Sequence, residues 1–298
     1  MLHNHLVAAI IIFVLTYGAI VSEKLDRTAI SLFGAVAMII FNVLPQDMAF
    51  ESIDFNTIGL LIGMMIIVNI LKRTGIFQYL AIKTAKRSKG DPWKVILLFS
   101  IITAISSALL DNVTTILLIA PVTLVITDTL EVNPIPFLIP EILAANIGGT
   151  ATLIGDPPNI MIGGATNLGF IDFIVNLFPA VLVIFVITLF ALKLIFKNSL
   201  TVNEKNKNKI ESLNEEKTIK DKTLLIKSIC VLVLTMIGFT LHQILGFESA
   251  TIALTGAAIL LLISKIEPEE ILLEIEWPTI FFFASLFVLV GALEEVGI

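Results

Sequence analysis

The sequence has few charged residues, no excess of positive charge and a single cysteine. Asp, Glu, Lys and Arg make up 15% of the 298 residues, against about 25% in soluble globular domains. The 19 Lys and Arg face 25 Asp and Glu, so the net charge of −6 excludes a general basic surface for nucleic acid. Because Cys230 is the only cysteine, a disulfide framework and a site of several cysteines are also excluded.

Hydrophobic residues are abundant instead, at 57% of the chain with a mean hydropathy of +0.99. They gather in runs separated by short charged stretches, which predicts an all-α polytopic membrane protein. The first run lacks the basic start of a signal peptide and is taken as the first transmembrane helix. The expected membrane segments are 6–21, 29–44, 57–71, 95–110, 113–127, 137–147, 160–168, 173–196, 224–241, 251–263 and 279–293.

Two of these runs, 137–147 and 160–168, are too short to cross a bilayer alone and predict two halves of one broken helix. Lys and Arg concentrate in 72–94 and 193–227, which places both segments in the cytoplasm. An even number of crossings must then separate them. That condition is met if the runs on either side of Asp111 form a re-entrant hairpin that enters and leaves on the cytoplasmic side.

The chain also repeats itself when it is shifted by 222 positions (256 minus 34). Gly34 and Ala35 then fall on Gly256 and Ala257, and Thr57 falls on Thr279. Because the two copies should cross the membrane in opposite senses, we expect an inverted-repeat transporter. Its parts would be first-copy scaffold helices (1–76), a transport region with an interfacial helix at 76–87, the hairpin, the broken helix and a last helix (77–197), a solvated cytoplasmic linker (198–223) and second-copy scaffold helices (224–298). The second copy is incomplete by this alignment and would need about 120 further residues.

Two clusters of polar residues interrupt the apolar runs. The first is at the expected hairpin tip, where an ionisable group is costly unless it faces protein, water or an ion. Its oxygen atoms suit a sodium ion or a proton, although Asp and Asn are also ordinary helix caps. The candidate residues at the tip are Ser106, Ser107, Asp111, Asn112 and Thr114.

The second cluster lies in the broken helix, where glycines permit backbone geometries closed to other residues and two prolines stop the helix. Non-helical backbone at membrane depth is tolerated where it is buried or lines a cavity, so this loop is a predicted binding loop rather than a simple kink. The candidate residues are Asn146, Gly148, Gly149, Thr150, Thr152, Gly155, Asp156, Pro157 and Asn159. A sodium ion could be held by Asp111, Asn112 and Asp156; Glu141 could face the same cavity or lie at the membrane interface.

Enzyme chemistry is not expected. A phosphate-binding loop needs Gly-Lys-Ser or Gly-Lys-Thr after its glycines, and the sequence has none. An intramembrane aspartyl protease would need Gly-x-Gly-Asp, but Leu153 stands at the first glycine of that motif. We expect no cofactor other than a coupling ion, Na⁺ or H⁺.

The stretch from Ala108 to Thr115 with Pro121, together with Asn146–Gly149 and Gly155–Asn159, resembles the ion transporter superfamily. The resemblance is to the branch of arsenite permeases, the P protein and NhaD-type sodium/proton antiporters, which share a citrate transporter-like domain. Dicarboxylate and citrate carriers differ by a Ser-Asn-Thr motif at the tip. The resemblance implies scaffold and transport domains, a homodimer, elevator-like alternating access and, for an arsenite permease, a peripheral ATPase subunit.

The sequence therefore predicts an ion-coupled secondary transporter in the lipid bilayer, most simply a prokaryotic plasma membrane. Arsenite or small-anion efflux and sodium/proton antiport are the leading activities, and a dicarboxylate or citrate symporter is the alternative. An alternative of another class is a truncated membrane fragment without transport, since a second hairpin and second broken helix are expected to complete the site.

Overall fold

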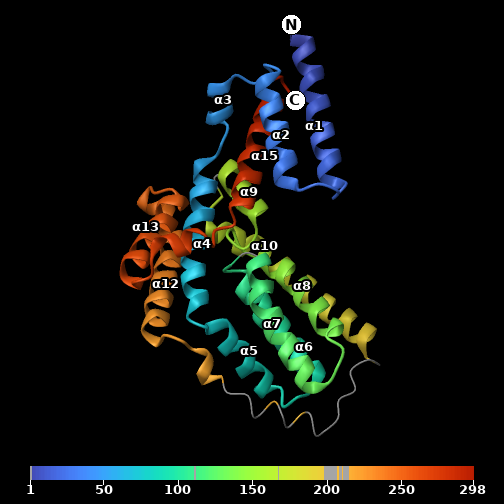
Figure 1. Ribbon diagram of the computed structural model, residues 1–298, viewed down its shortest axis with the longest axis vertical. Helices are drawn as coiled ribbons and strands as arrows, with labels where there is room; N and C mark the ends of the chain where they lie inside the picture. The colour runs from blue at the N-terminus through green and yellow to red at the C-terminus, as the bar shows by residue number, and fades with distance from the viewer. Residues whose placement is uncertain (1, 111, 167, 198–206, 208–209, 211–214) are drawn as a thin grey trace.

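The computed structural model describes residues 2–110, 112–166, 168–197, 207, 210 and 215–298 (Figure 1). Every regular element in these residues is a helix, as the sequence predicts. The first half of the chain contains α1 (Leu2–Val21), α2 (Arg27–Ile40), α3 (Gln46–Glu51), α4 (Phe55–Arg73), α5 (Ile76–Arg87), α6 (Pro92–Ser107) and α7 (Asn112–Leu130). The second contains α8 (Ile135–Gly149), α9 (Pro157–Thr166), α10 (Phe170–Phe196), the short 3-10 helix η1 (Glu216–Thr218), α12 (Lys222–Leu245), α13 (Ser249–Ser264), α14 (Pro268–Leu272) and α15 (Trp277–Glu295).

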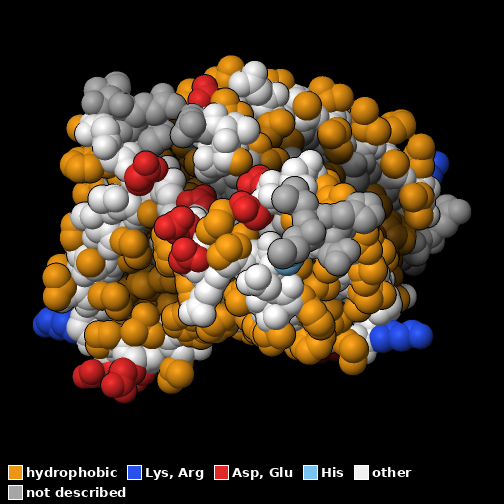
Figure 2. All heavy atoms as spheres, turned by 90° about the horizontal axis from the view of Figure 1, so that it is seen from above, with side chains coloured by type: hydrophobic (Ala, Val, Ile, Leu, Met, Phe, Trp, Pro, Cys, Tyr) orange, Lys and Arg blue, Asp and Glu red, His pale blue; other side chains and the backbone are white. Residues whose placement is uncertain are grey.

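The outside of the protein is apolar, as a bilayer requires. Five of the described helices, α4, α7, α10, α12 and α15, are long and apolar enough to cross a membrane. Large hydrophobic side chains on α10, among them Val183, Ile187 and Phe190, are exposed. In the view from above, hydrophobic side chains cover much of the face and acidic side chains gather near its middle (Figure 2). The protein is a polytopic membrane protein.

The predicted scaffold helices pack in pairs that join the two copies, α2 on α15 and α4 on α13 (Figure 1). Thr28 Oγ1 donates a hydrogen bond to the carbonyl oxygen of Pro278 at 3.1 Å, so α2 and α15 begin side by side. Ala250 N donates to Asn56 Oδ1 at 2.8 Å, so α13 and α4 also begin side by side. In the 222-residue repeat, Thr28 is equivalent to Ala250 and Asn56 to Pro278. The hydrogen bond between α2 and α15 and the hydrogen bond between α13 and α4 therefore join equivalent positions of the repeat.

The equivalent helices α4 and α15 run in opposite directions. Asn69 Nδ2, near the end of α4, donates to the carbonyl oxygen of Glu274, just before α15, at 3.1 Å. At the other end Gly291, near the end of α15, packs against the side chain of Ser52, just before α4. An antiparallel relation between equivalent helices is the geometry that an inverted repeat requires.

Small residues let the scaffold helices approach closely, as is common in membrane helix packing. A Cβ atom on Gly63 of α4 would lie 2.7 Å from the backbone carbonyl carbon of Ala253 on α13. Gly34 of α2 and the equivalent Gly256 of α13 each pack against a threonine hydroxyl of the preceding helix, Thr16 and Thr235 respectively. Gly34 and Gly256, which the repeat aligns, thus lie at equivalent helix contacts.

The predicted transport region, 77–197, contains the helices expected for the hairpin, the broken helix and the helix at 76–87. Helices α6 and α7 are joined by a short connection, and α8 packs against both arms (Figure 1). The break at 150–156 separates α8 from α9, which confirms the prediction of two half-helices. Helix α5 has the predicted bounds, Ile76–Arg87. Two short helices, α3 and α14, were not predicted, because they are too brief for a hydrophobic period to reveal.

Most of the expected solvated linker, 198–223, lies outside the described residues. Its described part contacts the transport region instead of extending away from it. Ile210 is fully buried in a cluster with Ala81, Phe99 and Phe137, and Lys220 N donates to the carbonyl oxygen of Thr74 at 3.0 Å.

Candidate functional site

The end of α6 is bound to the break between α8 and α9. Ser107 Oγ donates to the carbonyl oxygen of Ala145 on α8 at 2.7 Å. Thr152 Oγ1, within the break, donates to the carbonyl oxygen of Ala108 at 2.5 Å. The acceptor Ala108 directly follows α6, where carbonyl oxygens lack a partner within their own helix, whereas Ala145 lies inside the last turns of α8. The structure thus brings together the two polar clusters that the sequence singled out.

The break itself has a defined shape because one asparagine side chain spans it. Asn159 Nδ2 donates to the carbonyl oxygens of Thr150 and Thr152, at 3.1 and 2.8 Å. The hydroxyl of Thr152 accepts a bond from Gly155 N at 3.1 Å. Asn159 and Thr152 are buried, with 7% of each residue exposed. These bonds satisfy backbone groups that would otherwise be unpaired at membrane depth.

The glycines of the break serve close packing. Gly148 lies against the backbone of Ala104, and Gly149 and Gly155 lie against each other and against Ser107. None of Gly148, Gly149 and Gly155 has a positive φ. The expectation that they adopt a conformation closed to other residues is therefore wrong, because the absence of a side chain, and not the backbone angle, is what the contact with the hairpin requires.

An open groove of about 260 Å³ runs between α7 and α8 beside this contact. At its end Asn112 Nδ2 donates to Asn146 Oδ1 at 2.9 Å, and Asn146 Nδ2 donates to the carbonyl oxygen of Ile142 at 2.9 Å. Ile116 and Ile142 line its apolar part. The groove offers amide groups to a small polar ligand, with hydrophobic walls on either side.

The remaining predicted site residues lie in different surroundings. Asp111 is outside the described residues. Asp156 is half-buried immediately before α9, which begins at Pro157, and its carbonyl oxygen accepts a bond from Asn159 N. Ser106 is buried in the last turn of α6, and Thr150 Oγ1 donates to the carbonyl oxygen of Asn146 at 2.9 Å.

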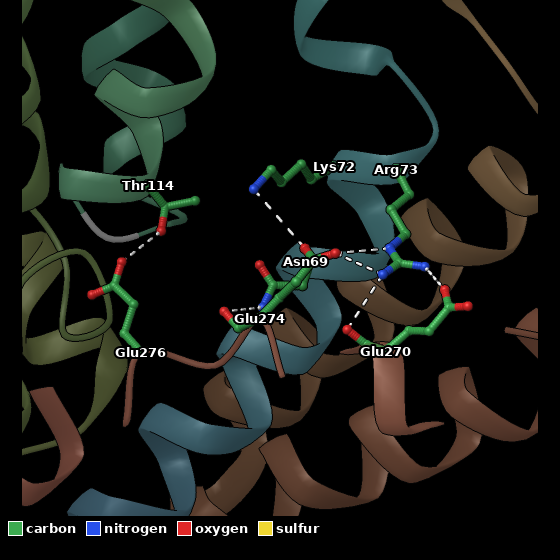
Figure 3. A network of polar contacts seen from close by, with 7 residues as sticks. All are labelled: Asn69, Lys72, Arg73, Thr114, Glu270, Glu274 and Glu276. Atoms are coloured by element: carbon green, nitrogen blue, oxygen red, sulfur yellow. Dashed lines mark hydrogen bonds and ion pairs between the residues drawn. The ribbon is translucent and has the colours of Figure 1, made fainter. Parts of the chain in front are cut away.

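Thr114 points toward the residue directly before α15. Its Oγ1 donates to Glu276 Oε1 at 3.5 Å (Figure 3). Glu276 stands directly before α15, so this contact joins the second arm of the hairpin to the second scaffold copy. Sequence reasoning missed Glu276, because nothing in the local pattern around it indicates a contact with residue 114.

A charged network beside this contact was also missed (Figure 3). Arg73, at the end of α4, donates through Nη2 to Glu274 Oε1 at 2.6 Å and through Nη1 to Glu270 Oε2 at 2.5 Å. Lys72 Nζ lies 3.9 Å from the other oxygen of Glu274. The sequence places basic residues in the last turn of α4 and acidic residues before α15, but only the packing of these elements pairs them.

Two further features involve carboxylates. Glu141, left open between the cavity and the interface, lies inside the transport region with 1% of its surface exposed. A cavity of about 410 Å³ near the starts of α4 and α13 is lined by Asp54, Thr57, Gly164 and Glu248, among others. Within the described part of the chain, no group of three or more His, Cys, Asp and Glu residues is arranged to hold a metal ion.

Comparisons with known proteins agree with this architecture. The sequence model of the family described as Citrate transporter matches residues 17–298. The 46 kDa membrane protein of Mycobacterium leprae is 43% identical over 98% of this chain and 69% of its own length. A protein of Mycobacterium tuberculosis named as an uncharacterized transporter is 42% identical over the same shares. The human P protein is 30% identical over 94% of this chain and 43% of its own length.

Proposed function

This chain belongs to the citrate transporter family, a family of membrane transporters, and on that premise we propose that it is an ion-coupled secondary transporter. Its coupling site would lie where the hairpin meets the broken helix, with Asp111, Asn112 and Asp156 binding Na⁺ or H⁺. The similarity to mycobacterial proteins supports a location of this chain in a bacterial plasma membrane.

The observation that carries this proposal is the bonded contact between the hairpin and the break. Ser107 and Thr152 tie the two interrupted segments together through backbone oxygens. Irregular backbone inside a membrane is tolerated where it is buried in protein or lines a cavity, and transporters use such segments for ion and substrate sites. The antiparallel relation of α4 and α15 supports an inverted repeat around this site.

The charge of the site favours a cation as the coupling species and a small neutral or inorganic solute as cargo. Asp111 and Asp156 would repel a dicarboxylate unless a cation were bound first. The leading candidate activities are therefore transport of arsenite or another small inorganic species, and sodium/proton exchange. The family description favours a second candidate, citrate or a dicarboxylate with a co-transported cation.

Reconstitution of the purified chain into liposomes tests the proposal. We expect a sodium gradient to drive proton movement, measured with an internal pH dye, or to drive uptake of arsenite or citrate. Asp156→Asn should abolish coupled flux, whereas Asp128→Asn, at an exposed carboxylate on α7, should leave it unchanged. Undiminished flux in a folded Asp156→Asn protein would contradict the assignment of the site.

A further inference from the structure

Glu141 is a carboxyl group enclosed by the three helices of the transport region. Thr123 Oγ1 on α7 donates to Glu141 Oε1 at 2.6 Å, and 1% of the Glu141 residue surface is exposed. The other carboxyl oxygen, Oε2, is buried and has no hydrogen-bond partner. An ionised carboxylate in that position would lack both water and a balancing charge, which is very costly in an apolar interior.

No described charged side chain is positioned to compensate a negative charge on Glu141. The helices packed most extensively against α8 are α6, α7 and α10. Their described charged residues are Lys94 on α6, Asp128 on α7, and Asp172 and Lys193 on α10. Lys94, Asp128 and Lys193 are exposed, and Asp172 is half-buried at the start of α10, where its side chain accepts a bond from the backbone. Asp111, between α6 and α7, lies outside the described residues and is itself acidic.

The helices around Glu141 carry buried hydroxyls that could share a proton. Ser100, Thr103 and Ser107 are fully buried and recur at spacings of three and four along α6, which puts them on one face. That face is turned to α8, because Ser107 donates to Ala145, one turn beyond Glu141. The hydroxyls of Ser100 and Thr103 have no hydrogen-bond partner, and neither does that of Thr115 on α7. A hydroxyl can both accept and donate, so it suits a protonated carboxyl group.

We propose that Glu141 is a proton-binding site inside the transport region, which holds a proton in this conformation and whose proton affinity depends on the contact between the hairpin and α8. Its bonded partner, Thr123, belongs to the hairpin, whereas Glu141 belongs to the broken helix. A change in the packing of these elements would change the hydration of the carboxyl group. This site does not depend on the cargo or on the coupling role of Asp111 and Asp156.

Infrared spectroscopy of the purified full chain in detergent or lipid tests the proposal without a transport assay. At neutral pH the carbonyl stretching band of a protonated carboxyl group should be present, should be lost in Glu141→Gln, and should remain in Asp128→Asn. On alkaline titration the band should disappear in the wild-type protein together with a fall in melting temperature. Glu141→Gln should show no such fall.

A second variant separates proton binding from a purely structural role. Thr123→Val removes the donor that stabilises the carboxylate form, so the band should persist to higher pH than in the wild-type protein. A wild-type band that Glu141→Gln does not reduce, or an unchanged titration midpoint in a folded Thr123→Val protein, would overturn the proposal. If Asp156→Asn abolishes transport but leaves the Glu141 band intact, the two sites are separate.

Discussion

Asp54 and Glu276 stand at equivalent positions of the sequence repeat, before α4 and before α15, and each is followed three residues later by a threonine. Asp54 accepts bonds from Asn56 N and Thr57 Oγ1, at 2.9 and 2.5 Å, and thereby caps α4. Glu276 accepts from Thr279 at 3.2 Å, but its longer side chain makes no cap bond to the backbone and reaches Thr114 in the hairpin.

The difference shows how one repeated pattern can serve two purposes. Asp54 is short enough to turn back on its own helix, and it also lies against Gly164 on α9. Glu276 has one more methylene group, so its carboxylate contacts the other half of the transport region. At these two equivalent positions, the carboxylate of the first copy therefore lies against the broken helix and that of the second contacts the hairpin, although the two share their spacing.

The largest effect should come from a close backbone contact between the two copies. In Gly63→Ala the new Cβ would meet the backbone of Ala253, which cannot rotate away. We expect a loss of stability of about 1–3 kcal/mol, although alanine favours the helix by about 1 kcal/mol. Thermal unfolding in detergent measures this change. Gly18→Ala, with nothing within 4 Å of the new atom, is the control and should not destabilise the protein. A neutral Gly63→Ala would refute the tight packing of α4 on α13.

The next effect concerns the ion pairs between the end of α4 and the segment before α15, which have no counterpart among the described residues at the end of α15. Arg73→Met should lower stability by about 1.5 kcal/mol, because it leaves the partly buried Glu274 without its donors. Glu295→Gln changes the equivalent residue of the second copy, which is exposed, and should have no effect. High salt should narrow the difference between wild type and Arg73→Met in the same unfolding assay. Equal effects of the two substitutions would argue against the network.

A smaller effect should distinguish the two caps. Asp54→Ala removes a side-chain cap and should cost about 1 kcal/mol, whereas Glu276→Ala should cost the helix less because no cap bond is lost. Hydrogen exchange should show faster opening of the first turn of α4 in Asp54→Ala. In Glu276→Ala, the change should instead appear around Thr114. Equal loss of protection at the two helix starts would show that the caps do not differ.

The smallest effect should come from the segment that joins the copies. Lys86 Nζ lies 2.7 Å from Glu215 Oε2, and this hydrogen bond lowers the pKa of the Glu215 carboxyl group. A lowered pKa means that the stabilisation is present at neutral pH and is lost as the pH falls below about 4. Hydrogen exchange in α5 should therefore increase more on acidification in the wild-type protein than in Glu215→Gln. Identical acid responses would mean that the ion pair contributes nothing.

The sequence predicted much of the local structure, because apolar runs and helix-breaking residues act on their own segment of the chain. Helix α5 has the predicted bounds, and the gap between α8 and α9 falls where Gly148, Gly149, Pro157 and Pro158 interrupt an apolar run. Composition alone placed the chain in a membrane. The acceptors of the hydrogen bonds from Ser107 and Thr152 could not be predicted, because they are backbone oxygens, which any residue could supply.

By itself the sequence determined the class of protein, the order of its helices and the two polar interruptions, because hydrophobic run length and helix-breaking residues act over a few turns. Only the tertiary structure decided which helices meet. The pairing of α4 with α13, the contact of Thr114 with Glu276 and the enclosure of Glu141 join residues far apart in the chain. Such contacts depend on side-chain shape and length across an interface, and spacing along one segment does not encode them.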